Sequence, residues 1–250
     1  MRYAALVRLV IIVGLIGLLE VLCRTGVITR FTMQPPTLIL RDLADILITG
    51  RYNAAIAKTL SNSAIAFVSA VVIGVAAGVV IHGVKLLREA LDPLFATYYA
   101  IPVLAFYPLL IILFGLGDAP QILIGFMLGV VAVIVNTLNG LDRVPRVLLK
   151  TARIARLSPA ATAWRITLPY AVPFVLTGVK LALAYSLIGV IGSEFIMSTG
   201  GMGFEISFAY NNFDNATMYP LIVLVLVTAI GLNMIVRRWE RLVLGRRGLQ

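Results

Sequence analysis

The sequence contains very little of the chemistry on which most enzymes depend. Its 250 residues include one cysteine, Cys23, and one histidine, His82. Neither a disulfide nor a Cys/His metal cluster can form within such a chain, so zinc and thiol-redox proteins are excluded. The phosphate-binding pattern G-x-x-x-x-G-K-[ST] is also absent. We therefore expect no catalytic residues, no metal ligands and no bound cofactor in this chain.

Charged residues are scarce as well. They make up 13% of the sequence, against about 25% in an ordinary globular domain, and 60% of the residues are hydrophobic. This composition argues strongly against a soluble domain. The net charge is +10, and the charged residues lie between long apolar runs. This arrangement favours an anionic membrane surface over nucleic acid as the partner.

The apolar runs are long enough to cross a bilayer, which takes about 20 residues. We expect six membrane-spanning helices in an all-α protein. They are Ala4 to Cys23, Asn62 to Val84, Thr97 to Leu116, Gln121 to Leu141, Tyr170 to Met197 and Met218 to Val236.

The distribution of Lys and Arg predicts which side each loop occupies, because positive charge near a span resists translocation. Two loops, Gly115 to Pro120 and Ser198 to Thr217, contain no Lys or Arg and should lie outside. With both termini in the cytoplasm, the inner side holds the basic residues, which are Lys85, Arg88, Arg143, Arg146, Lys150, Arg153, Arg156, Arg165, Arg237, Arg238, Arg241, Arg246 and Arg247.

Residues 24–61 are the exception, because this nominally outer segment holds Arg24, Arg30, Arg41, Arg51 and Lys58. We expect it to form two amphipathic helices, one from Leu38 to about Ile48 capped by Thr37, and one from Tyr52 to Leu60. They are expected to lie on the outer membrane face. The alternative is a contact with an extracytoplasmic partner.

Residues 142–168 form the longest inner connection and the most basic part of the chain. Their apolar spacing predicts two short helices that meet at Ser158-Pro159, with Ser158 as the N-cap of the second. The sequence Ile166-Thr167-Leu168-Pro169 then leads directly into the fifth span.

This loop resembles the EAA loop of bacterial binding-protein-dependent ABC-transporter permeases, whose pattern is EAA, three residues, G, nine residues, then I-x-L-P. The matching residues are Ala152, Ile166, Leu168 and Pro169. The departures are Lys150 for glutamate, Thr151 for alanine and Arg156 for glycine. Glycine permits a tight turn, so Arg156 implies a shifted turn or an acidic site on the partner.

Other segments resemble the nitrate/sulfonate/taurine branch of this family over about Gln34 to Glu240. They are Ala100 to Val103, Tyr107-Pro108, Phe114 to Asp118, Asn136 to Gly140, Leu168 to Pro173, Thr177 to Ala182, Ser193 to Phe195 and Gly200 to Gly203. The resemblance implies a type I ABC importer (MetI-like) permease fold, with residues 1–250 as a single transmembrane domain and residues 142–168 as its cytoplasmic coupling loop.

The resemblance further implies a transport subunit of the bacterial inner membrane that imports a small, anionic solute by alternating access. Its partners would be a cytoplasmic ATPase that binds ATP and Mg, an extracytoplasmic solute-binding protein and a second copy of the chain. The residues implied in coupling are Lys150, Thr151, Ala152, Arg153, Arg156, Leu157, Ser158, Ile166, Leu168 and Pro169. The same arginines also suit a simple positive-inside signal.

Polar or helix-breaking residues within the spans are candidates for the transport pathway. They are Pro102, Tyr107, Pro108, Asn136 and Glu194. For Glu194, a structural carboxylate bonded to the neighbouring backbone is the alternative. Gly74 and Gly78 predict close helix packing, Lys180 is expected to snorkel, and Glu20 could pair with Arg24.

An ion-gradient-driven secondary transporter is the alternative function. It would be expected to show an internal repeat and more intramembrane acids, neither of which is clear here. A membrane enzyme is disfavoured because the spans offer no paired carboxylates or nucleophile-base set. A scaffold would not need broken helices.

Overall fold

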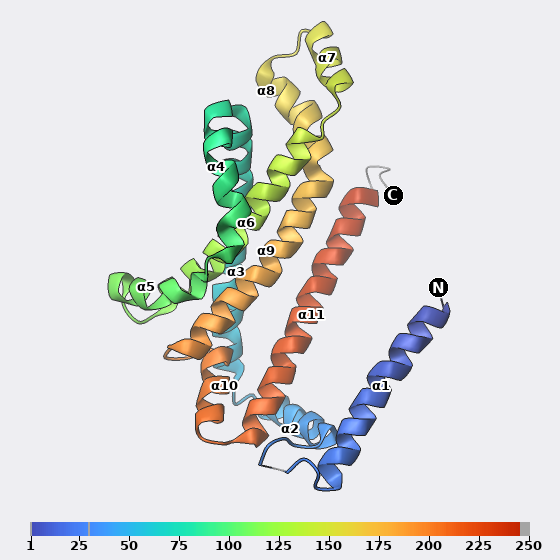
Figure 1. Cartoon of the computed structure of the whole chain (residues 1–250), viewed down its shortest axis with the longest axis vertical. Helices are drawn as coiled ribbons and strands as arrows, with labels where there is room; N and C mark the ends of the chain where they lie inside the picture. The colour runs from blue at the N-terminus through green and yellow to red at the C-terminus, as the bar shows by residue number, and fades with distance from the viewer. Residues whose placement is uncertain (1, 30, 246–250) are drawn as a thin grey trace. The chain divides into compact units, whose positions relative to one another are not determined.

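The computed structural model describes residues 2–29 and 31–245, and every regular element within them is a helix. Arg30, Arg246 and Arg247, which were counted for orientation, lie outside these residues. The chain divides into two compact units. Unit 1 comprises Met1–Lys58 and Glu194–Thr228, and unit 2 comprises Thr59–Ser193 and Ala229–Gln250. Each unit is described by itself (Figure 1).

Unit 1 begins with α1 (Arg2–Arg24), an apolar helix whose surface is almost entirely exposed. Near its end, Glu20 pairs with Arg24 as predicted, at 2.5 Å. Glu20 also accepts hydrogen bonds from the backbone N–H of Thr37, at 3.0 Å, and from its hydroxyl, at 2.7 Å. These bonds join α1 to the first turn of α2 (Pro36–Thr49). Within unit 1, α1 is therefore anchored by polar bonds near its end.

The predicted cap of α2 is wrong. Thr37 lies inside the helix, which starts at Pro36, and the flanking Pro35 makes no side-chain cap bond. Pro36 suits the first helical position because its ring presets φ and it has no N–H to satisfy. The free N–H of Thr37 is satisfied by Glu20 of α1 instead.

The predicted helix from Tyr52 to Leu60 is not a separate element. Gly50, with φ 65°, ends α2 in the left-handed region. After two turn residues, α3 then runs without interruption over Asn53–Gly83. No glycine or proline occurs from Asn53 to Ile73, so nothing breaks the helix between the interfacial and the apolar part.

The core of unit 1 lies among α2, the start of α3, α10 (Met202–Asn211) and the first part of α11 (Asn215–Gly245). Its buried members are Tyr52, Met202, Ile206, Leu221 and Leu224. Residues 198–217 were expected to be an outer loop and instead contain α10. Four of the five buried residues lie on α10 and α11, and their packing explains why this segment is helical.

Unit 2 is organised around α6 (Asp118–Asp142), more than half of which is buried. On one side α6 runs parallel to α3. Three contacts share one register, because in each the α6 residue follows the α3 residue by 59 positions: Asn62 with Gln121, Gly74 with Val133, and Gly78 with Thr137. The expected packing role of Gly74 and Gly78 agrees with this geometry, since a Cβ on either would lie within 2.8 Å of the α6 side chain.

On its other side α6 runs antiparallel to α9 (Leu168–Ile196). The contacts pair Gly125 with Gly189, Asn136 with Gly178, and Gly140 with Phe174. At the first crossing the backbones almost touch, because a Cβ on Gly189 would lie 2.7 Å from the Gly125 Cα atom. Small residues at such crossings allow the dispersion contacts that hold helices together where no hydrophobic effect acts between them.

The third span was expected from Thr97 to Leu116 with its prolines as breaks, and it is indeed broken. The segment begins earlier with α4 (Lys85–Thr97), continues through short turns at Tyr98–Ala100 (η1) and Val103–Phe106 (η2), and ends in α5 (Tyr107–Phe114). The two halves meet at 90° around Pro102. Pro102 lacks an N–H and disfavours a helical conformation at Ile101, so the helix cannot continue through this point.

The parallel arrangement of α3 and α6 explains why the chain contains this bent segment. Two consecutive long helices can run parallel only if the chain between them returns from one end to the other. The connection contains α4, η1, η2 and α5, so the bent pair makes that return. The bent pair and five long apolar helices account for six membrane crossings. The five helices are Leu6–Arg24, Asn53–Gly83, Asp118–Asp142, Ala163–Ile196 and Asn215–Val243.

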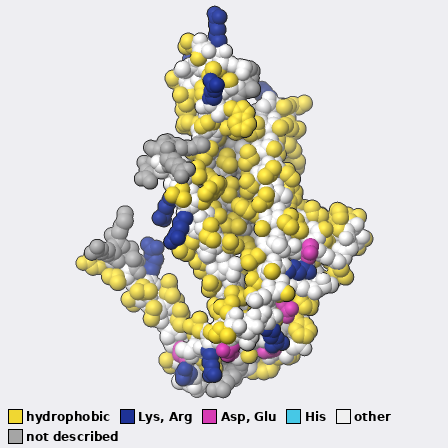
Figure 2. Space-filling model, turned by 180° about the vertical axis from the view of Figure 1, so that it is seen from behind, with side chains coloured by type: hydrophobic (Ala, Val, Ile, Leu, Met, Phe, Trp, Pro, Cys, Tyr) yellow, Lys and Arg dark blue, Asp and Glu magenta, His cyan; other side chains and the backbone are white. Residues whose placement is uncertain are grey.

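Side-chain exposure agrees with a bilayer location. On the face seen in Figure 2, hydrophobic side chains form most of the surface, and charged side chains occur singly or in small groups. In α4, the charges that lower its hydropathy are neutralised along the helix by Lys85 with Glu89 and by Arg88 with Asp92. Pairing four residues apart allows this helix to carry charge at the membrane edge.

The α6–α9 crossing yields a stability prediction. We expect Gly189→Ala to destabilise the protein by about 1–3 kcal/mol, because the new methyl group would meet backbone atoms that cannot move aside. Gly14→Ala on α1, where nothing lies within 4 Å, is the control and should stabilise slightly through helix propensity. Thermal unfolding of the two variants in the same detergent measures the effect. Equal unfolding temperatures would contradict the close approach.

Candidate functional site

The predicted pair of short helices in residues 142–168 is present. The first is α7 (Arg146–Ile154), which starts after Pro145, and the second is α8 (Pro159–Thr162). Ser158 caps α8 as expected, since its Oγ accepts a hydrogen bond from the Ala161 N–H at 3.2 Å. Both helices belong to unit 2 and are joined by a turn of four residues (Figure 1).

The turn depends on Arg156. This residue has φ 52°, in the left-handed region where glycine is favoured. The Leu157 N–H donates to the Ala152 carbonyl and the Arg156 N–H to the Arg153 carbonyl, each at 3.0 Å. This pair of bonds is a Schellman motif, which satisfies the last carbonyls of α7. Arginine therefore occupies a backbone conformation that suits glycine.

The second half of the loop joins the fifth span without a break. Residues Ala163–Thr167 (η3) form one π-helical turn, which continues directly into α9 at Leu168. Thr167 Oγ1 bonds the Thr162 carbonyl at 3.5 Å, which reaches back five residues as in a π-helix. Single π turns inside longer helices are frequent at functional sites. Ile166, Leu168 and Pro169 lie in this continuous stretch and are half-buried.

The remaining coupling candidates lie on the solvent-facing side of the loop. Lys150, Thr151, Arg153, Arg156 and Ser158 are exposed, Leu157 is half-buried and Ala152 is buried at 2% exposure. The ten sequence-predicted residues thus lie in one continuous stretch, with Ala152 buried, Lys150 and Arg156 exposed, and Arg153 exposed but also lining the cavity described below.

Sequence reasoning missed the apolar part of this surface. Val147, Ile154 and Trp164 are 71%, 83% and 74% exposed. The apolar spacing predicted the helices, but such spacing cannot distinguish a core from a partner surface. A tryptophan among basic residues was the signal that could have identified it, since tryptophan is enriched at interfaces.

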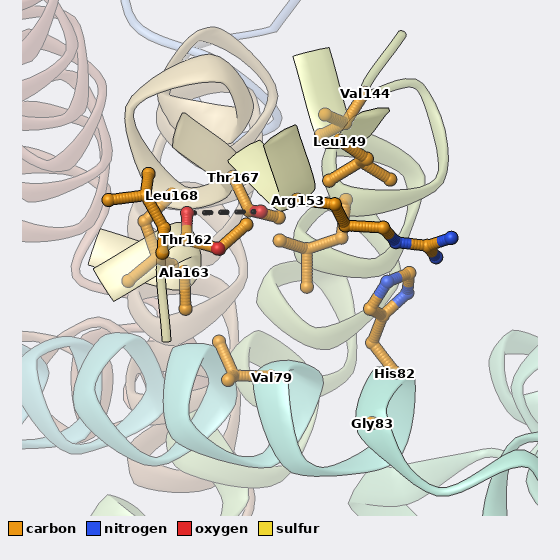
Figure 3. A pocket seen from close by; sticks show the side chains of 12 residues that line it. Val79, His82, Gly83, Val144, Leu149, Arg153, Thr162, Ala163, Thr167 and Leu168 are labelled. Carbon is orange, nitrogen blue, oxygen red and sulfur yellow. Dashed lines mark hydrogen bonds between the residues drawn. The ribbon is translucent and has the colours of Figure 1, made fainter. Parts of the chain in front are cut away.

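A cavity of about 450 Å³ lies within unit 2 behind this surface. Its lining comes from the end of α3, from α7 and from η3, and includes Val79, His82, Leu149, Arg153 and Thr167. Figure 3 shows the Arg153 guanidinium group extending towards the His82 ring. The lining is mostly apolar and combines residues of α3 with residues of the loop.

Polar contacts of Asp142 hold the first residues of the loop in place. Asp142, at the end of α6, contacts His82 Nδ1 of α3 at 3.1 Å and Arg88 of α4 at 3.0 Å. Arg88 also pairs with Asp92 at 2.8 Å. These contacts hold the ends of α3, α4 and α6 together, four residues before α7 begins.

The pathway candidates do not form one site. Pro102, Tyr107 and Pro108 lie together at the α4–α5 bend, where the two prolines are exposed and Tyr107 is buried at 1% exposure beside Val103 and Ile124. Asn136 lies elsewhere, on α6, where its side-chain N–H donates to the Ala132 carbonyl at 2.8 Å.

Glu194 belongs to unit 1 and is fully buried. Its carboxylate accepts a hydrogen bond from the Gly203 N–H at 3.0 Å, at the start of α10. Carboxylates are favoured there because the first N–H groups of a helix lack partners. Gly201, with φ 107°, passes so close to the Glu194 carboxyl group that a side chain at position 201 would overlap it.

The conformation of Arg156 predicts an unusual stabilising mutation. Arg156→Gly should stabilise α7 by about 1 kcal/mol, because it relieves a left-handed residue. Arg153→Gly removes the same charge from a helical position and should destabilise α7 by about 1 kcal/mol. Amide hydrogen exchange over α7 should slow in the first variant and quicken in the second. Changes of the same sign would disprove the turn geometry.

The Glu194 contact predicts a contrast between two adjacent glycines. Gly201→Ala should lower the unfolding temperature and the yield of folded protein, because it combines backbone strain with an overlap. Gly200→Ala should be tolerated, since its nearest neighbour would be Lys58 Nζ at 3.6 Å, an ordinary contact. Size-exclusion elution and thermal unfolding distinguish the two. Tolerance of both would show that Glu194 does not pack as described.

Comparison with known sequences supports the resemblance. A family model described as "Binding-protein-dependent transport system inner membrane component" matches residues 70–247. The nitrate import permease protein NrtB of Leptolyngbya laminosa is 30% identical over 181 residues, which are 72% of this chain and 65% of NrtB. The chain thus spans slightly less than two thirds of NrtB.

Two further similarities extend the match. The taurine transport system permease protein TauC of Escherichia coli (strain K12) is 27% identical over 219 residues, 86% of this chain and 80% of TauC. A chain of the structure described as "Inward facing conformations of the MetNI methionine ABC transporter: CY5 native crystal form" has a TM-score of 0.66 and 17% identity, covering 78% of this chain and 97% of that chain. At 17% identity, the similarity to the MetNI chain shows a shared fold.

The family model covers well over half of the sequence, including the last part of α3, the bent α4–α5 segment, α6 and the whole connecting loop with its continuous entry into α9. The chain therefore belongs to the family of inner membrane components of binding-protein-dependent transport systems.

Proposed function

We propose that this chain is the permease subunit of an ABC importer, in which residues 142–168 couple a separate ATPase to movement of the membrane helices. The observation that carries the proposal is the exposed surface of α7 and η3. Val147, Ile154 and Trp164 project from a helix pair that is continuous with a span. Apolar side chains exposed outside the apolar core of a membrane protein indicate a protein partner.

The loop has the mechanical properties that coupling requires. Ala152 and the Schellman bonds hold α7 rigidly against the turn, and α8 continues through η3 into α9. A force on α7 is then transmitted along α9 rather than absorbed by a flexible link. The cavity behind the loop gives the lever room, and the single π turn supplies a place where α9 can bend.

The charges of the loop specify the partner surface. Arg143, Arg146, Lys150, Arg153, Arg156 and Arg165 are all exposed, whereas Asp142 is already engaged by His82 and Arg88. A short helix with apolar tips and a basic rim fits an apolar groove with an acidic rim. Lys150, where the family pattern has glutamate, requires a carboxylate on the ATPase at that point.

The rest of the proposed assembly follows from the fold. On this proposal six crossings put both termini on the cytoplasmic side of a bacterial inner membrane, which the distribution of Lys and Arg supports. A second copy of this chain completes the pathway about a two-fold axis, and two ATPase subunits bind ATP and Mg. The chain itself performs transport and no catalysis. A solute-binding protein delivers the solute from outside.

The proposed solute is a small anion. NrtB and TauC are described as transporting nitrate and taurine, which share compact oxygen-rich anionic groups. Family membership favours this importer over the secondary transporter driven by an ion gradient.

The coupling surface can be tested by replacing one exposed residue. We expect Ile154→Asp to abolish retention of the ATPase, because a carboxylate cannot enter an apolar groove. Ile154 is 83% exposed, so the fold of this chain should not change. Leu86→Asp on α4 is the matched control, since Leu86 is 79% exposed and lies outside the loop. Co-purification from the native membrane, followed by ATPase activity in lipid, gives the measurement.

The outcomes are distinct. Loss of the ATPase in Ile154→Asp, with retention in Leu86→Asp and in the unaltered chain, supports the coupling surface. Equal retention in all three places the contact elsewhere. Absence of any ATPase from the unaltered chain, purified gently, would overturn the importer itself.

A further inference from the structure

A second, polar cleft in unit 2 lies between α9 and the last part of α11, away from the coupling loop. Its volume is about 480 Å³. Lys180 and Ala184 contribute from α9, and Asn233, Arg237, Glu240 and Arg241 from α11. The four α11 residues are spaced by four, three and one positions, so they share one face of the helix.

The cleft carries an excess of positive charge. Lys180 Nζ binds Glu240 Oε1 at 2.7 Å, and both side chains are largely buried. This ion pair is neutral as a whole and replaces the expected snorkelling of Lys180. Arg237 and Arg241 have no carboxylate partner among the residues that the structure describes. Two guanidinium groups therefore face the cleft without compensation.

The surroundings of the cleft are those of a membrane surface. Beside the arginines, α11 exposes Ile235, Trp239 and Leu242 at 63%, 50% and 64%. Tryptophan is enriched where the hydrocarbon meets the headgroups. Towards the membrane interior the cleft becomes neutral, with Leu181 and Ala184 of α9 opposite Asn233. A ligand that fits has a negative headgroup at one end and an apolar body at the other.

We propose that this cleft binds the phosphate headgroup of an anionic phospholipid, with Arg237 and Arg241 as the phosphate ligands and the Lys180–Glu240 pair as its floor. Arginine is suited to this role because its planar fork binds phosphate through two parallel hydrogen bonds. Basic pockets between membrane helices on the cytoplasmic side bind such headgroups. The assignment to the inner leaflet rests on the proposed function, whereas the binding itself does not.

In unit 2 the Lys180–Glu240 ion pair joins α9 to α11 at the level of the cleft. The proposed lipid contacts both of these helices. A bound phosphate reinforces the same joint, because it neutralises two arginines of α11 next to Lys180 of α9. Anionic lipid should therefore stabilise the packing of α11 against α9.

The experiment measures phospholipid binding by native mass spectrometry of the purified, delipidated complex. Phosphatidylglycerol is the probe, phosphatidylcholine the neutral comparison and inorganic phosphate the competitor. Arg237→Gln with Arg241→Gln should weaken phosphatidylglycerol binding about 25-fold, at about fivefold for each arginine. Arg238→Gln is the matched control, because this arginine lies on the same helix but does not line the cleft. It should change binding far less.

Glu240→Gln gives a test of opposite sign. It removes the one negative charge of the cleft, so phosphatidylglycerol should bind more tightly, by about fivefold. A purely structural ion pair would instead give weaker or unchanged binding. Equal losses in the double variant and in Arg238→Gln would overturn the site. Displacement of the lipid by millimolar inorganic phosphate would assign the cleft to a free anion. Each result is independent of ATPase retention and so separates this proposal from the coupling surface.

Discussion

The structure of unit 2 depends on how closely three helices approach one another. No water is present inside a bilayer to drive apolar surfaces together, so helices associate through dispersion contacts at short range. Here α6 meets α3 at Gly74 and Gly78 and meets α9 at Gly125 and Gly189. These crossings fix α6 parallel to one neighbour and antiparallel to the other. The bent α4–α5 segment follows from that arrangement, because the chain must return between two parallel helices.

The connecting loop links these closely packed helices to the proposed ATPase contact. Asp142 ties the ends of α3, α4 and α6 together, so α7 starts from a fixed base. At its other end, the turn holds although an arginine occupies the left-handed position. The strain costs about 1 kcal/mol and leaves a cation on the outer face of the loop. On the proposed function, this cost is offset by attraction to an acidic partner, which also accounts for Lys150.

Much of this arrangement could be predicted from the sequence, and the failures have physical causes. The lengths of the apolar runs located five spans, and Ser158-Pro159 located the turn between α7 and α8. The helix from Tyr52 to Leu60 and the span that follows it were predicted as two pieces and form one helix, because a change from polar to apolar residues is not a break in helical hydrogen bonding. Pro102 predicted the interruption of the third span but not its 90° angle, which depends on packing of Tyr107 against Ile124. The exposure of Val147 could not be predicted, since an apolar side chain that faces a partner has the same periodicity as one that faces a core.

The ionisable groups within the spans suggest how selectivity is divided in the proposed importer. Glu20 is bonded to Thr37 and Arg24, Lys180 to Glu240, and Glu194 to the start of α10. Each of the three groups thereby bonds a second element of its own unit and holds helices in place, since Glu20 reaches Thr37 of α2 in addition to Arg24 of its own helix. Lys180 is the cation among these three groups, and its pairing with Glu240 leaves it a weak attraction for a passing anion. Weak attraction suits a pathway that must release its solute, because a strongly bound anion would leave slowly. Recognition of the particular anion then falls to the solute-binding protein, and the permease contributes the opening through which the anion passes.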